Sequence, residues 1–211
     1  MDMARIPFAV RKGVQAEDMP RPLVGPVAFL LLERHASAGT GSAMADNTDA
    51  PGYLNPQIFT MAVDALPLIS MDLCVTNTSG QLMLGLRKNP PAQGFWFTPG
   101  GRIRKGESQH AAFQRLMNEE LTLTQVTFDR ATLMGAWDHF YEDSAFSSIT
   151  TTHYVNLPYL IQLTEEEEAQ ISLNGQHVDW RWFDVLRHED DIVHPYAQTY
   201  LDWIAHRRAV E

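Results

Sequence analysis

The sequence has few thiols and few basic residues. Its 211 residues include one cysteine, Cys74, so it can form no intramolecular disulfide and cannot build a thiolate-rich zinc site. A reducing cytoplasm is therefore the expected compartment. Only 16 lysines and arginines stand against 26 acidic residues, which gives a formal net charge of -10. This balance argues against nucleic acid or an anionic membrane as a partner. An anionic substrate would need a cation and a few placed arginines.

Long hydrophobic runs are also lacking. The longest, Leu23–Leu32, contains Gly25 and Pro26 and is shorter than the ~20 residues that a membrane-spanning helix needs. The segment before it is long and carries Asp2 and Glu17, unlike the short basic start of a signal peptide. We therefore expect a soluble protein with no membrane partner.

The chain divides into two parts by composition. The composition of residues 1–52 is uneven, with basic, polar and apolar pieces. The segment ends in a stretch rich in Gly, Ser, Ala, Thr and Asp, residues 36–52. Such a stretch buries little apolar surface and indicates a linker or a disordered tether, so residues 1–52 are predicted to be a partly disordered extension. Residues 53–211 have the texture of one compact mixed domain with its own core.

Residue patterns in this second part predict both strands and helices. Alternating apolar residues predict strands over 67–76 and 81–86, joined by a turn at 77–80. A helix is expected over 108–121, where Ser108 can act as the N-cap. Further strands are expected at 132–137, 151–163 and 179–183, and a terminal helix at 195–207. Together these elements predict an α/β sandwich around a mixed sheet.

One loop and the helix after it carry the chemistry. The adjacent glycines Gly100 and Gly101 allow close approach of the backbone, so a carbonyl there can be a hard oxygen donor to a cation. Glu119 and Glu120 are neighbours on the helix, so only one can point at the same target as the loop. Arg115 can pair with Glu119 four residues later, leaving the other carboxylate to a metal. Such oxygen donors suit Mg2+ or Mn2+, ions that normally accompany a diphosphate.

The order and spacing of these residues resemble the Nudix box, the strand–loop–helix signature of Nudix hydrolases. The family pattern runs Gly, five residues, Glu, seven residues, Arg-Glu, an aliphatic residue, any residue, Glu-Glu, any residue, Gly. The positions that match are Gly101, Glu107, Arg115, Glu119 and Glu120. Leu116 replaces the glutamate after the arginine, and Thr122 replaces the final glycine.

The leucine after the arginine is typical of GDP-mannose mannosyl hydrolase, a divergent Nudix subfamily. The likeness extends from about Tyr53 nearly to the C-terminus, without a counterpart for residues 1–52. The similar segments are 70–72, 85–87, 91–97, 137–141, 151–154 and 176–177. The resemblance implies a Nudix-type α/β/α sandwich around a mixed β-sheet and a homodimer. It also implies Mg2+-dependent hydrolysis of GDP-mannose and GDP-glucose, in which water attacks the sugar C1 with inversion and GDP departs.

The resemblance further implies roles for single residues at the reacting centre. The metal would be held by the Gly100 carbonyl, Glu120 and Gln176. His177 would be the general base, because an imidazole with an unperturbed pKa of ~6.5 can accept a proton near neutrality. The other catalytic residues would be His139, which orients His177, and Arg102 and Tyr154, which stabilise the leaving diphosphate. Asp72 would support the site electrostatically or lie near the sugar.

A second set of residues is implied on the substrate side. Arg87 would contact the substrate, and Arg115 would hold the metal-binding carboxylates. The guanine site would be built partly from N-terminal residues contributed across the dimer, which by position are Tyr53, Leu54 and Phe59.

Two other functions remain open at this point. A conventional Nudix pyrophosphohydrolase would attack phosphorus and hold its metal with Glu107, Glu119 and Glu120. A non-catalytic nucleotide-sugar-binding module would use a decayed box for binding alone. Among single residues, a histidine such as His139 between aromatic residues is more often packed in a core, and His177 on a polar loop is more often a surface residue.

The alternation of side chains along a strand predicts which face of the sheet several aromatic residues occupy. His153 and Tyr154 point to opposite faces of their expected strand, so only one can face the site, and we assign Tyr154 to it. Trp180 and Trp182 share one face and are expected in the core. The acidic run 165–168 is expected to be a solvated loop or the start of a helix.

Overall fold

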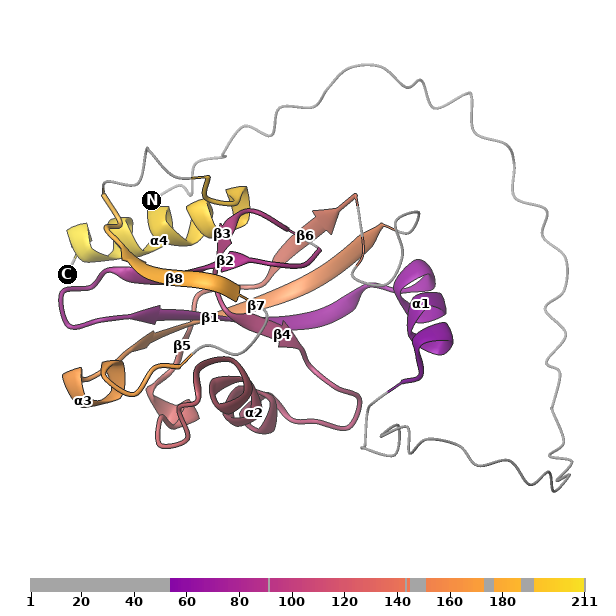
Figure 1. The fold of residues 1–211 in the computed structure, drawn as a ribbon, viewed down its shortest axis with the longest axis horizontal. Helices are drawn as coiled ribbons and strands as arrows, with labels where there is room; N and C mark the ends of the chain where they lie inside the picture. Colours follow the sequence, from indigo (N-terminus) through magenta and orange to yellow (C-terminus); the bar gives the residue numbers. More distant parts are fainter. Residues whose placement is uncertain are drawn as a thin grey trace, which may run out of the picture. The chain divides into compact units, whose positions relative to one another are not determined.

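The computed structural model describes residues 54–90, 92–142, 144, 151–172, 177–186 and 192–210 (Figure 1). The chain separates into a unit of residues 1–44 and a unit of residues 45–211, and all the described elements belong to the second. The predicted extension, residues 1–52, lies outside the described residues. Within the described part, no helix is long and apolar enough to cross a membrane.

Eight strands form one mixed sheet around β1 (Leu68–Thr76). β1 pairs in parallel with β7 (Thr152–Gln162) along its whole length, and antiparallel with β2 (Leu82–Arg87) and β4 (Gly100–Arg102). Besides β1, β2 also pairs antiparallel with β3 (Trp96–Phe97) and β8 (His177–Phe183). The strands that pair with β7 are β5 (Thr132–Leu133) and β6 (Trp137–Tyr141).

Helices cover both faces of this sheet (Figure 1). α2 (Gln109–Leu121) packs on one face with the buried side chains Met71, Leu73 and Met83. α4 (Pro195–Val210) packs on the other with Leu82 and Leu84. The remaining helices are α1 (Pro56–Ala65), a 3₁₀ turn (Phe128–Arg130) and the short α3 (Glu165–Glu168). The predicted α/β sandwich around a mixed sheet is therefore confirmed.

The ends of α2 explain one departure from the family pattern. Ser108 caps its N-terminus as predicted, with its hydroxyl accepting the Ala111 N–H at 3.1 Å. At the C-terminus, Thr122 adopts the left-handed conformation (φ 62°, ψ 22°) that usually selects glycine. Its hydroxyl donates to the Ser172 carbonyl at 2.9 Å, a contact that glycine could not make and that offsets part of the backbone strain.

Several element boundaries differ from the predictions. α1 was not predicted, and the glycines Gly100 and Gly101, which were expected in a loop, begin β4. The expected strand 132–137 is two strands, separated at Gly135 (φ 153°). The strand expected from 179 begins at His177. The acidic run does begin a helix, because Thr164 and Glu167 form a capping box at the start of α3.

Candidate active site

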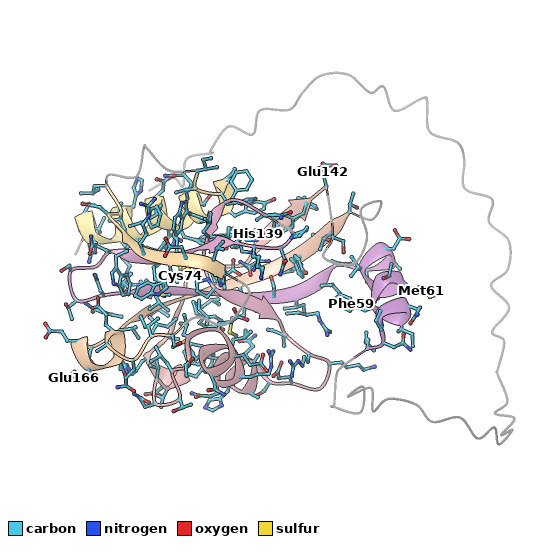
Figure 2. All side chains as sticks on the ribbon, in the orientation of Figure 1. Phe59, Met61, Cys74, His139, Glu142 and Glu166 are labelled. Atoms are coloured by element: carbon cyan, nitrogen blue, oxygen red, sulfur yellow. The ribbon has the colours of Figure 1, made fainter. Side chains whose placement is uncertain are left out.

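A cavity of about 310 Å3 opens at one end of the sheet. It brings together six of the predicted site residues, which are Asp72, Arg87, Gly100, Arg102, His139 and Tyr154. They come from β1, β2, β4, β6 and β7, so the cavity depends on the pairing of five strands. Figure 2 shows His139 among the strands in the body of the sheet, below α4. Tyr154, rather than His153, is the residue of its pair that lines the cavity.

The cavity has two chemically different parts. Asp72 and His139 are almost completely buried, whereas Arg87 and Arg102 are partly exposed. Burial raises the pKa of the Asp72 carboxyl to about 6, against the hydrogen bonds from Tyr200 and Asn156 that lower it. The deep end therefore offers hydrogen-bond acceptors, and the outer part offers cations.

The two glycines of the box are required by close contacts. Gly100 pairs with Asp72 across β4 and β1, and a Cβ on it would lie 2.5 Å from the Met71 carbonyl oxygen and 2.7 Å from Asp72 Oδ1. A Cβ on Gly101 would lie 2.9 Å from Cδ2 of Leu116. The Leu116 side chain is buried in the core below α2, so the residue that replaces the family glutamate packs and carries no charge.

Arg115 forms hydrogen bonds with two of the three box carboxylates, those of Glu107 and Glu119. Its Nε and Nη2 donate to the two carboxylate oxygens of Glu107 at 2.7 and 2.9 Å, and Nη2 also donates to the Arg102 carbonyl at 3.0 Å. Nη1 donates to Glu119 Oε2 at 2.8 Å, so the predicted Arg115–Glu119 pair is confirmed. These contacts lower the pKa of Glu107. Glu120 lies on the buried side of α2 and is 3% exposed.

His177 is a buried strand residue and not the surface loop residue that its sequence context suggested. It begins β8 opposite Arg87, and its ring lies against Gly85, where a Cβ would be 2.4 Å from Cδ2 of the imidazole. Neither ring nitrogen has a hydrogen-bond partner among the described residues. Burial, and then the charge of Arg87, lower its pKa to about 4, below the ordinary value from which a base near neutrality was predicted.

His139 and His177 do not contact each other in the described structure. The His139 ring is stacked on Tyr196 of α4, with centroids 3.8 Å apart, and its Nε2 lies 3.2 Å from the Tyr200 hydroxyl. His177 lies over Gly85, which shares a face of β2 with Met83 and so faces α2. The described structure thus contains no hydrogen bond through which His139 could orient His177.

Helix α4 adds a buried polar network that the sequence did not predict. Tyr200 donates to Asp72 Oδ2 at 2.7 Å, and Asn156 donates to the same oxygen at 3.0 Å. Ser70 donates to Asn156 Oδ1 at 2.8 Å. A serine and an asparagine within apolar strands were the only signal for this network, and nothing in the spacing connects them with Tyr200.

The remaining predicted residues have different outcomes. Tyr53 and Gln176 lie outside the described residues. Leu54 is exposed just before α1, and Phe59 contacts Arg102, whose guanidinium lies 4.8 Å from the ring centroid. Figure 2 shows Phe59 on the side of α1 that faces the sheet, with Met61 pointing away. Phe59 therefore contacts a residue of the site within its own chain, and a contribution across a dimer stays a prediction.

Two further expectations concern packing and metal ligands. Trp180 and Trp182 pack against the core below α2, as predicted. In the part of the chain that the structure describes, no group of three His, Cys, Asp or Glu side chains could together hold a metal ion. The predicted set contains one carboxylate and two carbonyl-type oxygens, so it does not depend on such a group.

Comparison with known proteins places this geometry in a family. Residues 67–204 match the NUDIX domain. A relative from Haloferax volcanii, the low-salt glycan biosynthesis protein Agl8, is 33% identical over 137 residues, which cover 65% of this chain and 81% of the relative. The chain therefore belongs to the Nudix family. Nudix hydrolases generally use a divalent metal such as Mg2+ or Mn2+.

Solved structures share the fold. The MutT protein from Methanosarcina mazei Go1 aligns with a TM-score of 0.53 at 17% identity, covering 68% of this chain and 97% of that one. The MutT Nudix hydrolase from Burkholderia pseudomallei aligns with a TM-score of 0.51 at 23% identity, covering 65% and 98%. At these identities the likeness concerns the fold alone.

Proposed function

We propose that this Nudix hydrolase cleaves GDP-mannose and GDP-glucose to GDP and free sugar, by attack of water at the sugar C1 with inversion. The observation that carries the proposal is the polarity of the cavity. Asp72 and His139 at its deep end can accept hydrogen bonds from sugar hydroxyls, whereas Arg87 and Arg102 in its outer part can neutralise a diphosphate. A nucleotide sugar has this order of groups along its length.

The family relative supports a sugar-containing substrate. The printed name of the Haloferax volcanii protein refers to glycan biosynthesis, and the two chains are 33% identical over 137 residues. GDP-sugars as the substrate class of this chain follow from the leucine at position 116 and from the cavity, and they form part of the proposal.

The state of the box favours attack at carbon over attack at phosphorus. Metal-assisted attack at phosphorus by the conventional route would use several box glutamates, but Glu107 and Glu119 are both held by Arg115. Leu116 contributes no carboxylate. We assign the metal to Glu120, the buried carboxylate of the box, and a single ion suits stabilisation of a leaving group.

The residues present fit a divalent ion. Gly100 lines the cavity, so its backbone can approach a ligand, and Glu120 supplies a buried carboxylate. In our proposal the Gly100 carbonyl, Glu120 and Gln176 would hold Mg2+ or Mn2+, which would supply positive charge to stabilise a diphosphate leaving group.

Protein groups supply the rest of the proposed chemistry. Arg87, Arg102 and Tyr154 bind the diphosphate, and burial raises the pKa of the Tyr154 hydroxyl, so it stays protonated and can donate. In the proposal His177 accepts the proton of the attacking water, as the resemblance implies; its ring nitrogens have no partner among the described residues and its low pKa keeps it neutral at pH 7, but it does not line the cavity in this structure. Asp72 favours positive charge developing on the sugar.

We also propose a cytoplasmic homodimer, in which Tyr53, Leu54 and Phe59 help to bind guanine. Large apolar side chains of the α1 region, including Ile58, Met61 and Leu66, are exposed and available for such a contact. Light scattering of the full chain would give the oligomeric state directly.

Hydrolysis in oxygen-18 water tests the proposed reaction. With GDP-mannose and Mg2+, we expect the label in the sugar and none in the phosphate, and NMR should detect the inverted anomer first. Label in a phosphate, with release of GMP and sugar phosphate, would instead establish a pyrophosphohydrolase. Binding of GDP-sugars without any turnover would establish a binding module.

A further inference from the structure

The hydroxyl of Tyr200 lies at the centre of a buried polar network behind the cavity. This side chain is fully buried in α4, and its oxygen is 2.7 Å from Asp72 Oδ2, 2.6 Å from Asn156 Nδ2 and 3.2 Å from His139 Nε2. Two of these three neighbours, Asp72 and His139, also line the cavity. Tyr200 therefore connects two cavity groups from the side that a substrate does not reach.

The protons of this network can be assigned from its geometry. An ionised carboxylate only accepts hydrogen bonds, so the single hydroxyl proton of Tyr200 must go to Asp72. The amide of Asn156 has its oxygen turned to the Ser70 hydroxyl, so its nitrogen donates to Asp72 and Tyr200. The Tyr200 oxygen can then only accept from His139, and Nε2 of that ring must carry a proton.

The second ring nitrogen of His139 is left unprotonated. Burial lowers the pKa of the imidazole to about 3, so the ring is neutral and carries one proton, which is on Nε2. Nδ1 has no hydrogen-bond partner among the described residues, and His139 lines the cavity. Stacking on Tyr196, with ring planes 5° apart, fixes the plane of the imidazole.

We propose that Tyr200 is a positioning residue that holds His139 in the Nε2–H tautomer and so makes Nδ1 a hydrogen-bond acceptor for a sugar hydroxyl in the cavity. The identity of the hydroxyl donor as a sugar rests on the proposed function, whereas the tautomer rests on the network alone. The site would then select a substrate that presents a hydroxyl, rather than a second acceptor, at its deep end.

The tautomer can be measured without any turnover. The full chain is labelled with ¹⁵N-histidine and its imidazole nitrogens are recorded by long-range ¹H–¹⁵N correlation at pH 8; His139→Asn assigns the signals. We expect His139 as Nε2–H in the wild type and in Tyr196→Phe, which keeps the stacked ring. Tyr200→Phe should shift the ring towards a mixture of tautomers. A wild-type His139 ring protonated at Nδ1 would overturn the proposal. This measurement uses the wild type alone, so it decides the question even if Tyr200→Phe does not fold.

Binding gives the second readout. Affinities for GDP-mannose and for GDP are measured by calorimetry without divalent metal, so that the sugar nucleotide is not consumed. Tyr200→Phe should weaken GDP-mannose about two- to tenfold, the value of one hydrogen bond, and leave GDP unchanged. Equal effects on both ligands, or none on either, would overturn the positioning role. Failure of the proposed reaction would appear instead in the oxygen-18 experiment.

Discussion

The two faces of the sheet handle charge in different ways. On the face covered by α2, full charges are paired close to the surface, as in the contacts of Arg115 with Glu107 and Glu119. On the face covered by α4, an acidic group and an imidazole are buried and connected through the neutral hydroxyl of Tyr200. The paired charges belong to one stretch of chain, whereas Asp72 and Tyr200 are 128 residues apart. A contiguous motif thus fixes the first arrangement, and only the complete fold fixes the second.

The largest expected effect concerns the carboxylate that Arg115 does not hold. Glu120→Gln keeps the shape of a buried side chain and removes its charge, so we expect kcat/KM to fall on the order of 10³-fold in saturating Mg2+. Glu119→Gln is the matched control on the neighbouring residue, which is 41% exposed at its side chain, and should cost less than about tenfold. Equal losses in the two variants would contradict the division of the box carboxylates.

A smaller effect is expected at Gly85, which gives His177 its space. A Cβ at this position would lie 2.4 Å from the imidazole, so Gly85→Ala must displace the ring, and we expect kcat/KM to fall about 10- to 100-fold. A double-mutant cycle isolates the cause. In a His177→Ala background, where the ring is absent, Gly85→Ala should have little further effect. Additive losses would show that Gly85 acts through something other than His177.

The contrast between the faces also explains which parts could be predicted. Ser108, Arg115 and Glu119 lie within one helix length, so capping and i,i+4 rules predict their contacts correctly. The position of His177 depended on pairing between β2 and β8, which spacing along the chain does not encode. Tyr200 was missed for the same reason, because its contact with Asp72 joins residues 128 positions apart and depends on how α4 packs on the sheet.

Two bidentate arginine–glutamate pairs allow the effect of the box on activity to be separated from its effect on the free energy of unfolding. Arg115 binds both carboxylate oxygens of Glu107 through Nε and Nη2, and Arg130 binds both oxygens of Glu167 at α3 through Nη1 and Nη2. Lysine cannot form either bidentate pair, so each Arg→Lys variant should lose about 1 kcal/mol of unfolding free energy in urea titrations. Only Arg115→Lys should also lower kcat/KM, about tenfold. Loss of activity in Arg130→Lys of the same size would indicate a general effect of destabilisation.

The last expected effect is a change in how stability depends on pH. Burial lowers the pKa of His139 from 6.5 to about 3, so below pH 6.5 the unfolded chain binds a proton that the native ring refuses. Stability is therefore lost as the pH falls, by roughly 1.4 kcal/mol per unit in this window. His139→Asn should remove this contribution, whereas His177 and Asp72 titrate in both proteins. Replacement of the exposed His206 in His206→Asn is the control for loss of a histidine that is not buried. Urea denaturation at pH 7, 6 and 5 measures the slopes, and parallel curves for His139→Asn and wild type would mean that the buried imidazole is protonated as easily as a solvated one.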